Sequence, residues 1–440
     1  MTHAAWPTYD SYRKTQNEWV PEIPARWSEK RLKHLGFLYA GIAGKAGEDF
    51  SKEPREGFLP FVPFVSVANF SRIPAKFEFV RAKESEGQNR IHRGDLLFLM
   101  SSETEEDIAR STLFDLDDIQ PFLNSFCKGF RPDQSRLIAN FASYLLKAKG
   151  YRDYFTTSAR GFTRINLKQE YILNLPVLLP PLPEQRAIAA FLDEKCANVD
   201  EAVRIKEEQI ALLRERRQIL IQQAVTRGLN PSAPMKDSGI DWIGQIPAHW
   251  EQLANKHIFR LRKTLVGKRS SEYELLSLTL RGIIKRDMEN PEGKFPAEFD
   301  TYQEVSPGDF VFCHFDVEET PRTVGLSEFF GMITGAYTVY SVADGVDPRF
   351  LLHFYICADT DKKMRSLYKG LRNTIPKDVF GAFKTPLPPI EEQREIVAHI
   401  DEASRKIEDA IAIKEEQIAA LKEYKTSLIN AAVTGKIKVA

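Results

Sequence analysis

The residues that could carry catalytic chemistry do not assemble into a familiar catalytic motif. The segment Gly41–Ala46 comes closest to a phosphate-binding loop, but its glycine spacing is wrong and no Ser or Thr follows the lysine. No G-x-G-x-x-G fingerprint follows a strand-like segment, and no Asn/Asp-Pro-Pro-aromatic tetrapeptide is present to hold a target amine. The nuclease-like string Pro132-Asp133-Gln134 lacks an acidic-x-lysine partner. We therefore expect a binding or scaffold protein without catalytic residues.

One group of metal-binding residue types remains, in which Cys313 and His314 precede Asp316. A lone His and Asp at the end of a strand are usually structural, so we predict no metal site there. The four cysteines are scattered without a C-x-x-C pair, which argues against zinc and disulfides and fits a reducing compartment. The polar N-terminus lacks the apolar core of a secretion signal, and no apolar run is long enough to span a membrane. We expect a cytoplasmic protein.

Nucleic-acid binding is a candidate function, because three stretches interleave bases with aromatic side chains. Lys and Arg neutralise phosphates, and Arg reads guanine by paired hydrogen bonds. The bulk charge gives no support, since 61 basic residues balance 61 acidic ones. A solvated helix face followed by a loop would give the same local composition. The candidate DNA-binding residues are Lys147, Lys149, Arg152, Arg160, Arg164, Lys168, Arg262, Lys263, Lys268, Arg269, Lys369, Arg372 and Lys377.

The strongest signal in the sequence is a duplication. Residues Pro181–Thr226 align with Pro389–Thr434 at a constant offset of 208, with 23 identities in 46 positions. Unrelated segments of ordinary composition would share roughly 3. The block Ile-Lys-Glu-Glu-Gln-Ile-Ala at residues 205–211 returns unchanged at residues 413–419. A period this long indicates a repeated domain unit rather than a short solenoid repeat.

Each copy is predicted to be one long helix with a coiled-coil seam. Prolines block helix before Glu184 and Glu392, and Gly228 and Gly435 follow where a C-terminal glycine belongs. Seam residues step by three and four through five heptads, which is the spacing of a coiled coil. The seam, which is also the candidate partner surface, includes Leu192, Val199, Val203, Lys206, Ile210, Leu213, Arg217, Ile407, Ile411, Lys414, Ile418, Leu421 and Lys425.

Bases occupy the same two seam positions in both copies. Lys206 matches Lys414, and Arg217 matches Lys425. Polar seam residues tend to fix register and partner, whereas long basic side chains can also pack their stems and extend their charges into water. Both interpretations stay open. A helix of roughly 43 residues would be about 65 Å long, and we predict that the two helices pair antiparallel.

The regions that precede the two helices are related more weakly. Residues 19–27 resemble residues 242–250, and Gly94-Asp95 with its following apolar run resembles Gly308-Asp309. Apolar alternation and composition predict strands at 61–67, 77–80, 96–100, 275–280 and 337–342, and helices at 137–149 and 350–367.

We therefore predict an α+β protein with a pseudo-two-fold internal repeat, in which two mixed α/β domains are separated by two long antiparallel coiled-coil helices. The predicted boundaries are 1–180 and 231–385 for the domains, and 181–230 and 386–440 for the helices.

This combination resembles the specificity subunit of type I restriction–modification systems. The resemblance rests on a variable domain, a proline-rich Glu-Gln entry and a long helix that carries Ile-Lys-x-x-Gln-Ile, all of which occur twice. The segment Asp237–Trp250 is similar to that family's entry into a target-recognition domain, and the Ala-Val-Thr tails at 224–226 and 432–434 also fit. The first domain departs from the pattern, because Asn17–Pro21 lacks the fuller Asp-Ser-Gly form found at 237. The resemblance covers nearly the whole chain.

The resemblance implies that each globular domain is a target-recognition domain that reads one half of a split site on double-stranded DNA. The helices would set the distance between the half-sites and dock two methyltransferase subunits. The specificity subunit itself would be non-catalytic and bind no cofactor or metal. S-adenosylmethionine for adenine methylation would belong to the methyltransferase partners, and ATP with magnesium to restriction subunits. The interiors, roughly 36–160 and 255–365, would hold the base-reading residues.

Two other functions stay open at this point. The chain could be a coiled-coil scaffold whose duplicated domains bind proteins. It could also be the same kind of subunit used in another defence or phase-variable methylation system. A single-chain restriction enzyme or methyltransferase is disfavoured by the missing motifs.

Overall fold

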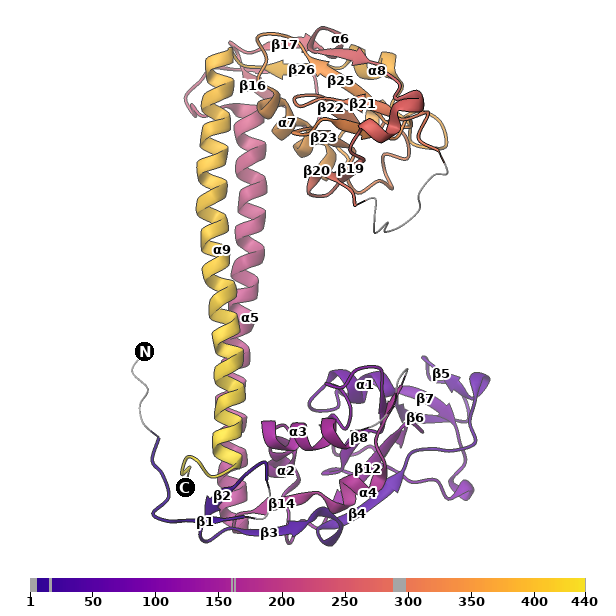
Figure 1. Ribbon diagram of the computed structural model, residues 1–440, viewed down its shortest axis with the longest axis vertical. Helices are drawn as coiled ribbons and strands as arrows, with labels where there is room; N and C mark the ends of the chain where they lie inside the picture. The colour runs from indigo at the N-terminus through magenta and orange to yellow at the C-terminus, as the bar shows by residue number, and fades with distance from the viewer. Residues whose placement is uncertain (1–5, 16–17, 160, 162–163, 288–297, 440) are drawn as a thin grey trace. The chain divides into compact units, whose positions relative to one another are not determined.

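The computed structural model describes residues 6–15, 18–159, 161, 164–287 and 298–439. The chain divides into two compact units, residues 1–206 with 416–440 and residues 207–415. Each unit contains a mixed α and β domain together with part of each of two long helices (Figure 1). This confirms the predicted fold class. No helix in the described part of the chain is both long enough and apolar enough to cross a membrane.

The domain of the first unit, here called domain 1, is built on an antiparallel sheet of four strands. Their order is β10 (Ser111–Leu113), β8 (Leu96–Leu99), β12 (Cys127–Pro132) and β4 (Gly36–Ala40). The central strand β8 is buried along its whole length. Leu96 and Phe98 enter one hydrophobic cluster, whereas Leu97 and Leu99 enter another, as the alternation of a strand requires. The sheet is therefore covered on both faces.

A second four-stranded sheet completes domain 1. Its order is β11 (Phe122–Leu123), β6 (Phe58–Val62), β7 (Glu78–Arg81) and β5 (Phe50–Ser51), and only the β11–β6 pair is parallel. Three short antiparallel pairs are β1 (Tyr12–Lys14) with β2 (Glu22–Pro24), β3 (Ser28–Arg31) with β14 (Pro176–Leu179), and β9 (Ser101–Ser102) with β13 (Ile165–Asn166).

The domain of the second unit, here called domain 2, repeats this frame. Its sheet has the order β18 (Phe259–Arg262), β25 (Thr338–Val342), β22 (Phe310–Phe312) and β23 (Val324–Leu326). Four antiparallel pairs are β15 (Met235–Asp237) with β16 (Gln245–Pro247), β17 (Glu251–Ala254) with β26 (Lys384–Leu387), β19 (Leu276–Thr279) with β20 (Gly282–Lys285), and β21 (Gln303–Val305) with β24 (Gly331–Ile333). In chain order, the strands of the two main sheets correspond one to one.

The repeated Gly-Asp pairs belong to this common frame. Gly94 and Gly308 have φ values of 90° and 88°, which favour glycine, at the turns that lead into β8 and β22. The aspartates that follow are buried, and each accepts a hydrogen bond from a backbone amide of its own turn at 2.8 Å. Asp95 also pairs with Arg131 and Asp309 with Arg262, both at 2.8 Å. A buried carboxylate thus fixes the same sheet corner in both domains.

The short helices lie outside the sheets and correct part of the sequence prediction. They are α1 (Phe64–Asn69), α2 (Ala139–Leu145), α3 (Lys149–Ser158), α4 (Gln169–Asn174), α6 (Asn255–Ile258), α7 (Pro348–Thr360) and α8 (Lys377–Ala382). The strand predicted at 61–67 is wrong after Val62, because helix α1 begins at Phe64, directly after Pro63.

Both domain helices predicted from the sequence were too long. The helix predicted at 137–149 is broken, since α2 and α3 are separate and Ala148 has extended backbone angles. The helix predicted at 350–367 ends at Thr360, and Lys362 then adopts a left-handed φ of 49° that a helix does not tolerate. Apolar periodicity continues across these breaks, so it does not predict where the helices end.

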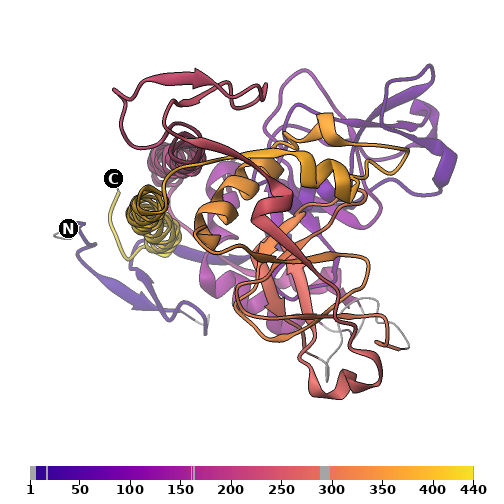
Figure 2. The same cartoon turned by 90° about the horizontal axis from the view of Figure 1, so that it is seen from above.

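The long helices are α5 (Leu182–Arg227) and α9 (Ile390–Val433), with 46 and 44 residues. Gly228 and Gly435, with φ values of 70° and 74°, follow their C-termini as predicted. The helices lie side by side in both views (Figures 1 and 2). In the first unit Lys425 pairs with Asp200, and in the second Arg217 pairs with Glu408. Residue numbers rise along one helix as they fall along the other, so the pairing is antiparallel.

The predicted seam faces the partner helix. Leu192, Val199, Val203, Ile210 and Ile407 are buried. Leu213, Ile411, Ile418 and Leu421 are half-buried, as are the seam bases Lys206, Arg217, Lys414 and Lys425.

Three of these seam bases bond to the opposite helix. Lys206 donates to Gln417 at 2.7 Å, Arg217 pairs with Glu408 at 2.8 Å, and Lys425 reaches Asp200 at 2.6 Å. These bases therefore bury their stems and also pair across the seam, so the two interpretations of them are compatible. An exposed pair of this kind contributes about 0.2–1 kcal/mol.

Candidate nucleic-acid interface

Each mixed α and β domain is attached to the start of a long helix through side chains that recur in both units. The two motifs that recur in the sequence meet at such attachments. The Nε1 atom of Trp27 donates to Glu184 at 3.2 Å, and Nε1 of Trp250 donates to Glu392 at 3.0 Å. Both indoles are buried, with exposed fractions of 2% and 0%. Each long helix therefore begins against the tryptophan that opens its own unit's domain.

The glutamine that follows each glutamate forms the second attachment. Gln185 Nε2 donates to the Pro180 carbonyl at 2.9 Å, while its Oε1 accepts from the amide of Ile138 at 2.9 Å. Gln393 repeats both contacts at 2.8 Å, with Pro388 and Asp347. Since Ile138 and Asp347 precede α2 and α7, each glutamine connects the long helix to a helix of the domain.

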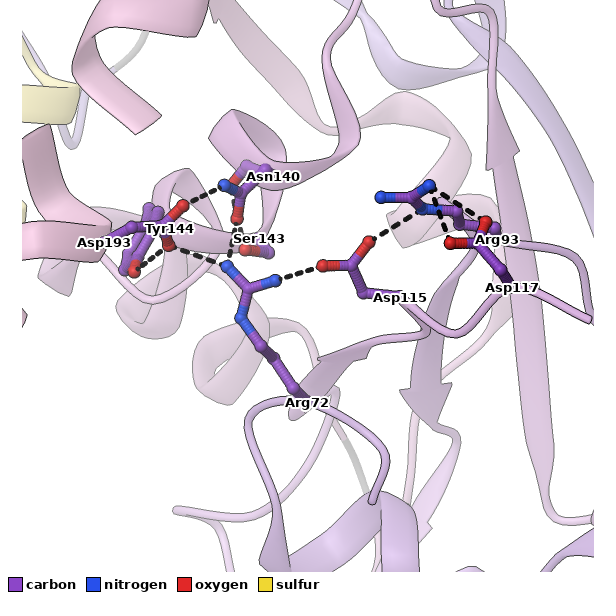
Figure 3. Close-up of polar contacts among 8 residues, drawn as sticks. All are labelled: Arg72, Arg93, Asp115, Asp117, Asn140, Ser143, Tyr144 and Asp193. Carbon is purple, nitrogen blue, oxygen red and sulfur yellow. Dashed lines mark hydrogen bonds and ion pairs between the residues drawn. The ribbon is translucent and has the colours of Figure 1, made fainter. Parts of the chain in front are cut away.

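An aspartate two turns further along each helix adds a third attachment. In domain 1, Asp193 accepts from Asn140 at 2.6 Å, Tyr144 at 2.7 Å and Arg72 at 2.7 Å (Figure 3). Burial and then the Asp193 carboxylate raise the pKa of Tyr144, so this phenol remains a donor. Arg72 continues to Asp115 at 2.6 Å.

The chain of ion pairs in domain 1 continues beyond Asp115. Arg93 pairs with Asp115 at 3.1 Å and with Asp117 at 2.9 Å (Figure 3). The chain of ion pairs therefore extends from Asp193 on the long helix to the loop after β10.

The second unit has the same third attachment in simpler form. Asp401, at offset 208 from Asp193, accepts from both terminal nitrogens of Arg349 at 2.8 and 2.7 Å. In the sequence, Glu184 and Glu392 served only to mark where the long helices begin, and all three attachments were missed. The available signal was that Glu, Gln and Asp all recur at one offset while the tryptophans recur at another, which marks two surfaces that must fit together.

The candidate DNA-binding residues of domain 1 differ in their exposure to solvent. Lys147 is half-buried over the ring of Tyr144, and its pKa is lowered to about 8 by burial and then by Arg72. Arg152 donates to the carbonyls of Glu106 and Ile108 at 2.8 and 2.6 Å, and burial lowers its pKa. Both line a hollow of about 500 Å³ beside α5, and their contact with DNA stays a prediction.

The remaining candidates of domain 1 are more exposed. Lys149 is 80% exposed and pairs with Asp153 at 2.9 Å, and Lys168 is 79% exposed and lies 3.8 Å from Glu170. Arg164 is exposed and lies over the ring of Phe126. Arg160 lies outside the described residues.

In domain 2 several candidates have structural partners. Arg262 is held by Asp309 and Glu304, which ties it to the sheet corner. Arg372 pairs with Asp316, and its guanidinium lies 5.3 Å from the centroid of the Phe315 ring.

The other basic candidates of domain 2 lie at its surface. Lys268 pairs with Asp300 at 2.9 Å, and Arg269 lies over Tyr273. Lys263, Lys369 and Lys377 are exposed. Their contact with DNA stays a prediction.

His314 and Asp316 both contact other side chains of domain 2. The imidazole stacks on Phe312 at 5.4 Å and packs against Phe380 at 4.8 Å. Burial lowers the pKa of His314 to about 4, so the ring is neutral at physiological pH. Asp316 is engaged with Arg372. Within the described ranges, no three His, Cys, Asp or Glu side chains gather as a cation site would require.

Comparison with known proteins finds similarity to one family. Residues 27–213 match the family model described as the type I restriction modification DNA specificity domain. A Methanocaldococcus jannaschii protein, assigned as the specificity subunit of the type I restriction enzyme MjaX, is 24% identical over 98% of this chain and 97% of its own length.

Two solved structures share the fold. The HsdS subunit of Thermoanaerobacter tengcongensis has a TM-score of 0.52 and 17% identity, covering 94% of this chain and 98% of that one. A chain from a study of assembly and conformational transition of the type I R-M system has a TM-score of 0.66 and 16% identity, covering 94% and 99%.

The match to a DNA specificity domain covers most of domain 1 and part of α5, and domain 2 repeats the strand order of the main sheet of domain 1. More narrowly, the chain is similar to specificity subunits of type I restriction–modification systems, the family that its sequence resembles.

Proposed function

We propose that each domain reads one half of a bipartite DNA site and that α5 and α9 set the spacing between the halves. The observation that carries this proposal is the duplicated attachment through Glu184, Gln185 and Asp193 and through Glu392, Gln393 and Asp401. A domain that pivoted freely on its helix would lose the register of its half-site within a few base pairs, at about 3.4 Å each. Three attachments per domain oppose such pivoting.

The same helices are proposed to dock two methyltransferase subunits. On α5, Ile205, Leu212 and Ile219 are 42%, 63% and 48% exposed and recur every seven residues, so they share one outer face. On α9, Ile413, at offset 208 from Ile205, is 53% exposed, and Tyr424 is 40% exposed. Only Ile205 and Ile413 occupy matching positions, and this matched exposed pair supports binding of two copies of one helical partner.

In this proposal the chain performs no chemistry itself. Adenine methylation with S-adenosylmethionine is assigned to the methyltransferase partners, and ATP- and magnesium-dependent cleavage is assigned to restriction subunits. The contribution of this chain is recognition, register and assembly.

The spacing role is tested by inserting one heptad into each long helix at matched positions. Seven residues add about 10 Å of helix, or about three base pairs of DNA. The expected result is a methylated bipartite site whose half-sites are unchanged but lie about three base pairs further apart, measured by long-read methylome mapping. An unchanged spacing would refute the spacing role.

The DNA-binding role is tested by a mobility shift of duplex DNA with the full chain and its methyltransferase. The expected shift weakens steeply as salt rises, because phosphate contacts release counterions. Absence of any shift at low salt would instead favour a protein-binding scaffold.

A further inference from the structure

Domain 1 contains a hollow of about 470 Å³ beside Arg164, and we infer that it reads the edge of a G·C base pair in the half-site of this domain. It lies where β9 pairs with β13, next to the turn that leads into β12. The lining side chains that carry the argument are Ser101, Glu103, Asp107, Asn124, Phe126 and Arg164. The inference rests on the proposed DNA-reading function and adds which side chains meet a base.

Arg164 offers the strongest donor in the hollow. Its guanidinium carbon lies 5.8 Å from the centroid of the Phe126 ring, and that ring is 55% exposed. No carboxylate pairs with Arg164 among the described residues, unlike Arg372 at the matching position of domain 2, which pairs with Asp316. An arginine held on an aromatic face keeps its planar set of donors for a ligand.

Two further donors line the same hollow. Asn124 accepts a hydrogen bond from the Phe126 amide at 2.8 Å through Oδ1, which leaves its NH₂ group to donate. Ser101 is 8% exposed, and its hydroxyl is one of the buried polar atoms without a partner in the described structure. An unsatisfied buried hydroxyl is unfavourable, so a ligand acceptor would relieve it. Guanine presents two acceptors, O6 and N7, in the major groove.

The acidic side chains of the hollow argue for a base edge and against a phosphate. Glu103 is exposed. Asp107 accepts a hydrogen bond from the Thr104 hydroxyl at 3.0 Å and forms an ion pair with Arg110 at 3.2 Å. Carboxylates beside the site repel a phosphate, whereas a carboxylate can accept from the N4 amino group of cytosine. Donors for guanine and an acceptor for cytosine therefore lie in one hollow.

The inference is tested by selecting a duplex library, randomised in both half-sites, with the full chain in complex with its methyltransferase. Arg164→Ala is expected to lower the preference for G·C at one position of one half-site by about 5- to 140-fold, the range that a bidentate arginine–guanine contact supports. The other half-site and the salt dependence should stay unchanged. A loss of affinity that is uniform across sequences, with the salt slope reduced by about one, would show a phosphate contact and overturn the inference.

Two matched variants complete the test. Arg81 also lies over a ring, 5.2 Å from the centroid of Phe58, but outside the hollow, so Arg81→Ala should leave that position unaffected. Asn124→Asp keeps the acceptor for the Phe126 amide but removes the donor, so it should alter preference at the Arg164-dependent position or its neighbour.

The outcomes separate the two proposals. If the wild-type complex selects a bipartite motif but neither Arg164→Ala nor Asn124→Asp alters any position, the base-reading inference is wrong while the proposed function stands. If the wild-type complex selects no motif, the proposed function fails and the inference fails with it. Thermal unfolding of each variant checks that domain 1 is intact.

Discussion

Replacing Gln185 by leucine should loosen domain 1 from its helix. The side chain is 1% exposed. Its amide donates to the carbonyls of Pro180 and Arg136 at 2.9 and 3.1 Å and accepts from the amide of Ile138 at 2.9 Å. Leucine is similar in size, so packing changes little, but one buried N–H and two carbonyls lose their partner.

The expected magnitude follows from those three groups. An unsatisfied buried polar group costs about 1–3 kcal/mol, and water or a small shift can relieve some of that cost. We expect the free energy of opening α2 away from α5 to fall by about 3 kcal/mol. That loss corresponds to roughly 100-fold faster hydrogen exchange in α2, measured by mass spectrometry on the full chain.

Two variants calibrate this measurement. Gln393→Leu removes two contacts instead of three, so exchange in α7 should accelerate by a smaller factor. Gln218→Leu, at an exposed position of α5, should stay within about 0.5 kcal/mol of the wild type. Unchanged exchange in α2 of the Gln185→Leu variant would refute the argument that this amide locks the domain to the helix.

Three further predictions concern stability. Gly435→Ala should destabilise by more than about 2 kcal/mol, because the added Cβ would lie 2.4 Å from Pro24 Cδ and φ is 74°. Gly228→Ala meets its nearest atom at 3.0 Å and should cost only about 1 kcal/mol, so equal losses in thermal unfolding would contradict this reasoning. Burial lowers the pKa of His314 from 6.5 to about 4. As the pH falls from 6.5 towards 4, the unfolded chain therefore takes up the proton before the folded chain does, and the free energy of unfolding decreases. His314→Phe should flatten that fall in urea midpoints, and an equally steep fall would exclude His314 as its source. Asp401→Asn should cost about 0.5–1 kcal/mol at low salt and almost nothing at 1 M salt, because its ion pair with arginine is exposed; a salt-independent loss in thermal unfolding would argue for another role.

The long helices could be predicted because their signals are local. A spacing of three and four residues, prolines in front and a glycine behind determine a helix, its apolar face and its end within a few turns. The shorter elements were predicted less well. Helix α1 begins directly after Pro63, in the middle of an apolar run. Helix α7 ends at Thr360, and the left-handed backbone of Lys362 prevents it from continuing. Apolar composition alone does not distinguish these cases.

The candidate site was predicted only in outline. Lys147, Arg152 and Arg262 were grouped with exposed bases because sequence gives residue type but not environment. In the structure the first two are half-buried beside α5, and Arg262 pairs with Asp309. Asn124 and Ser101 gave no signal of their own, since small polar residues are common in turns.

The sequence by itself determined that the chain is duplicated, that each copy ends in a long helix with a paired seam, and that no familiar catalytic motif accompanies them. These conclusions depend on spacing along the chain. Only the tertiary structure decided that Glu184 meets Trp27 and that Gln185 meets Ile138. It also decided which arginines pair with a carboxylate, as Arg372 does, and which lie on an aromatic ring without such a pair among the described residues, as Arg164 does. Such contacts join residues far apart in sequence, and burial and partner geometry determine whether a charge serves the fold or a ligand.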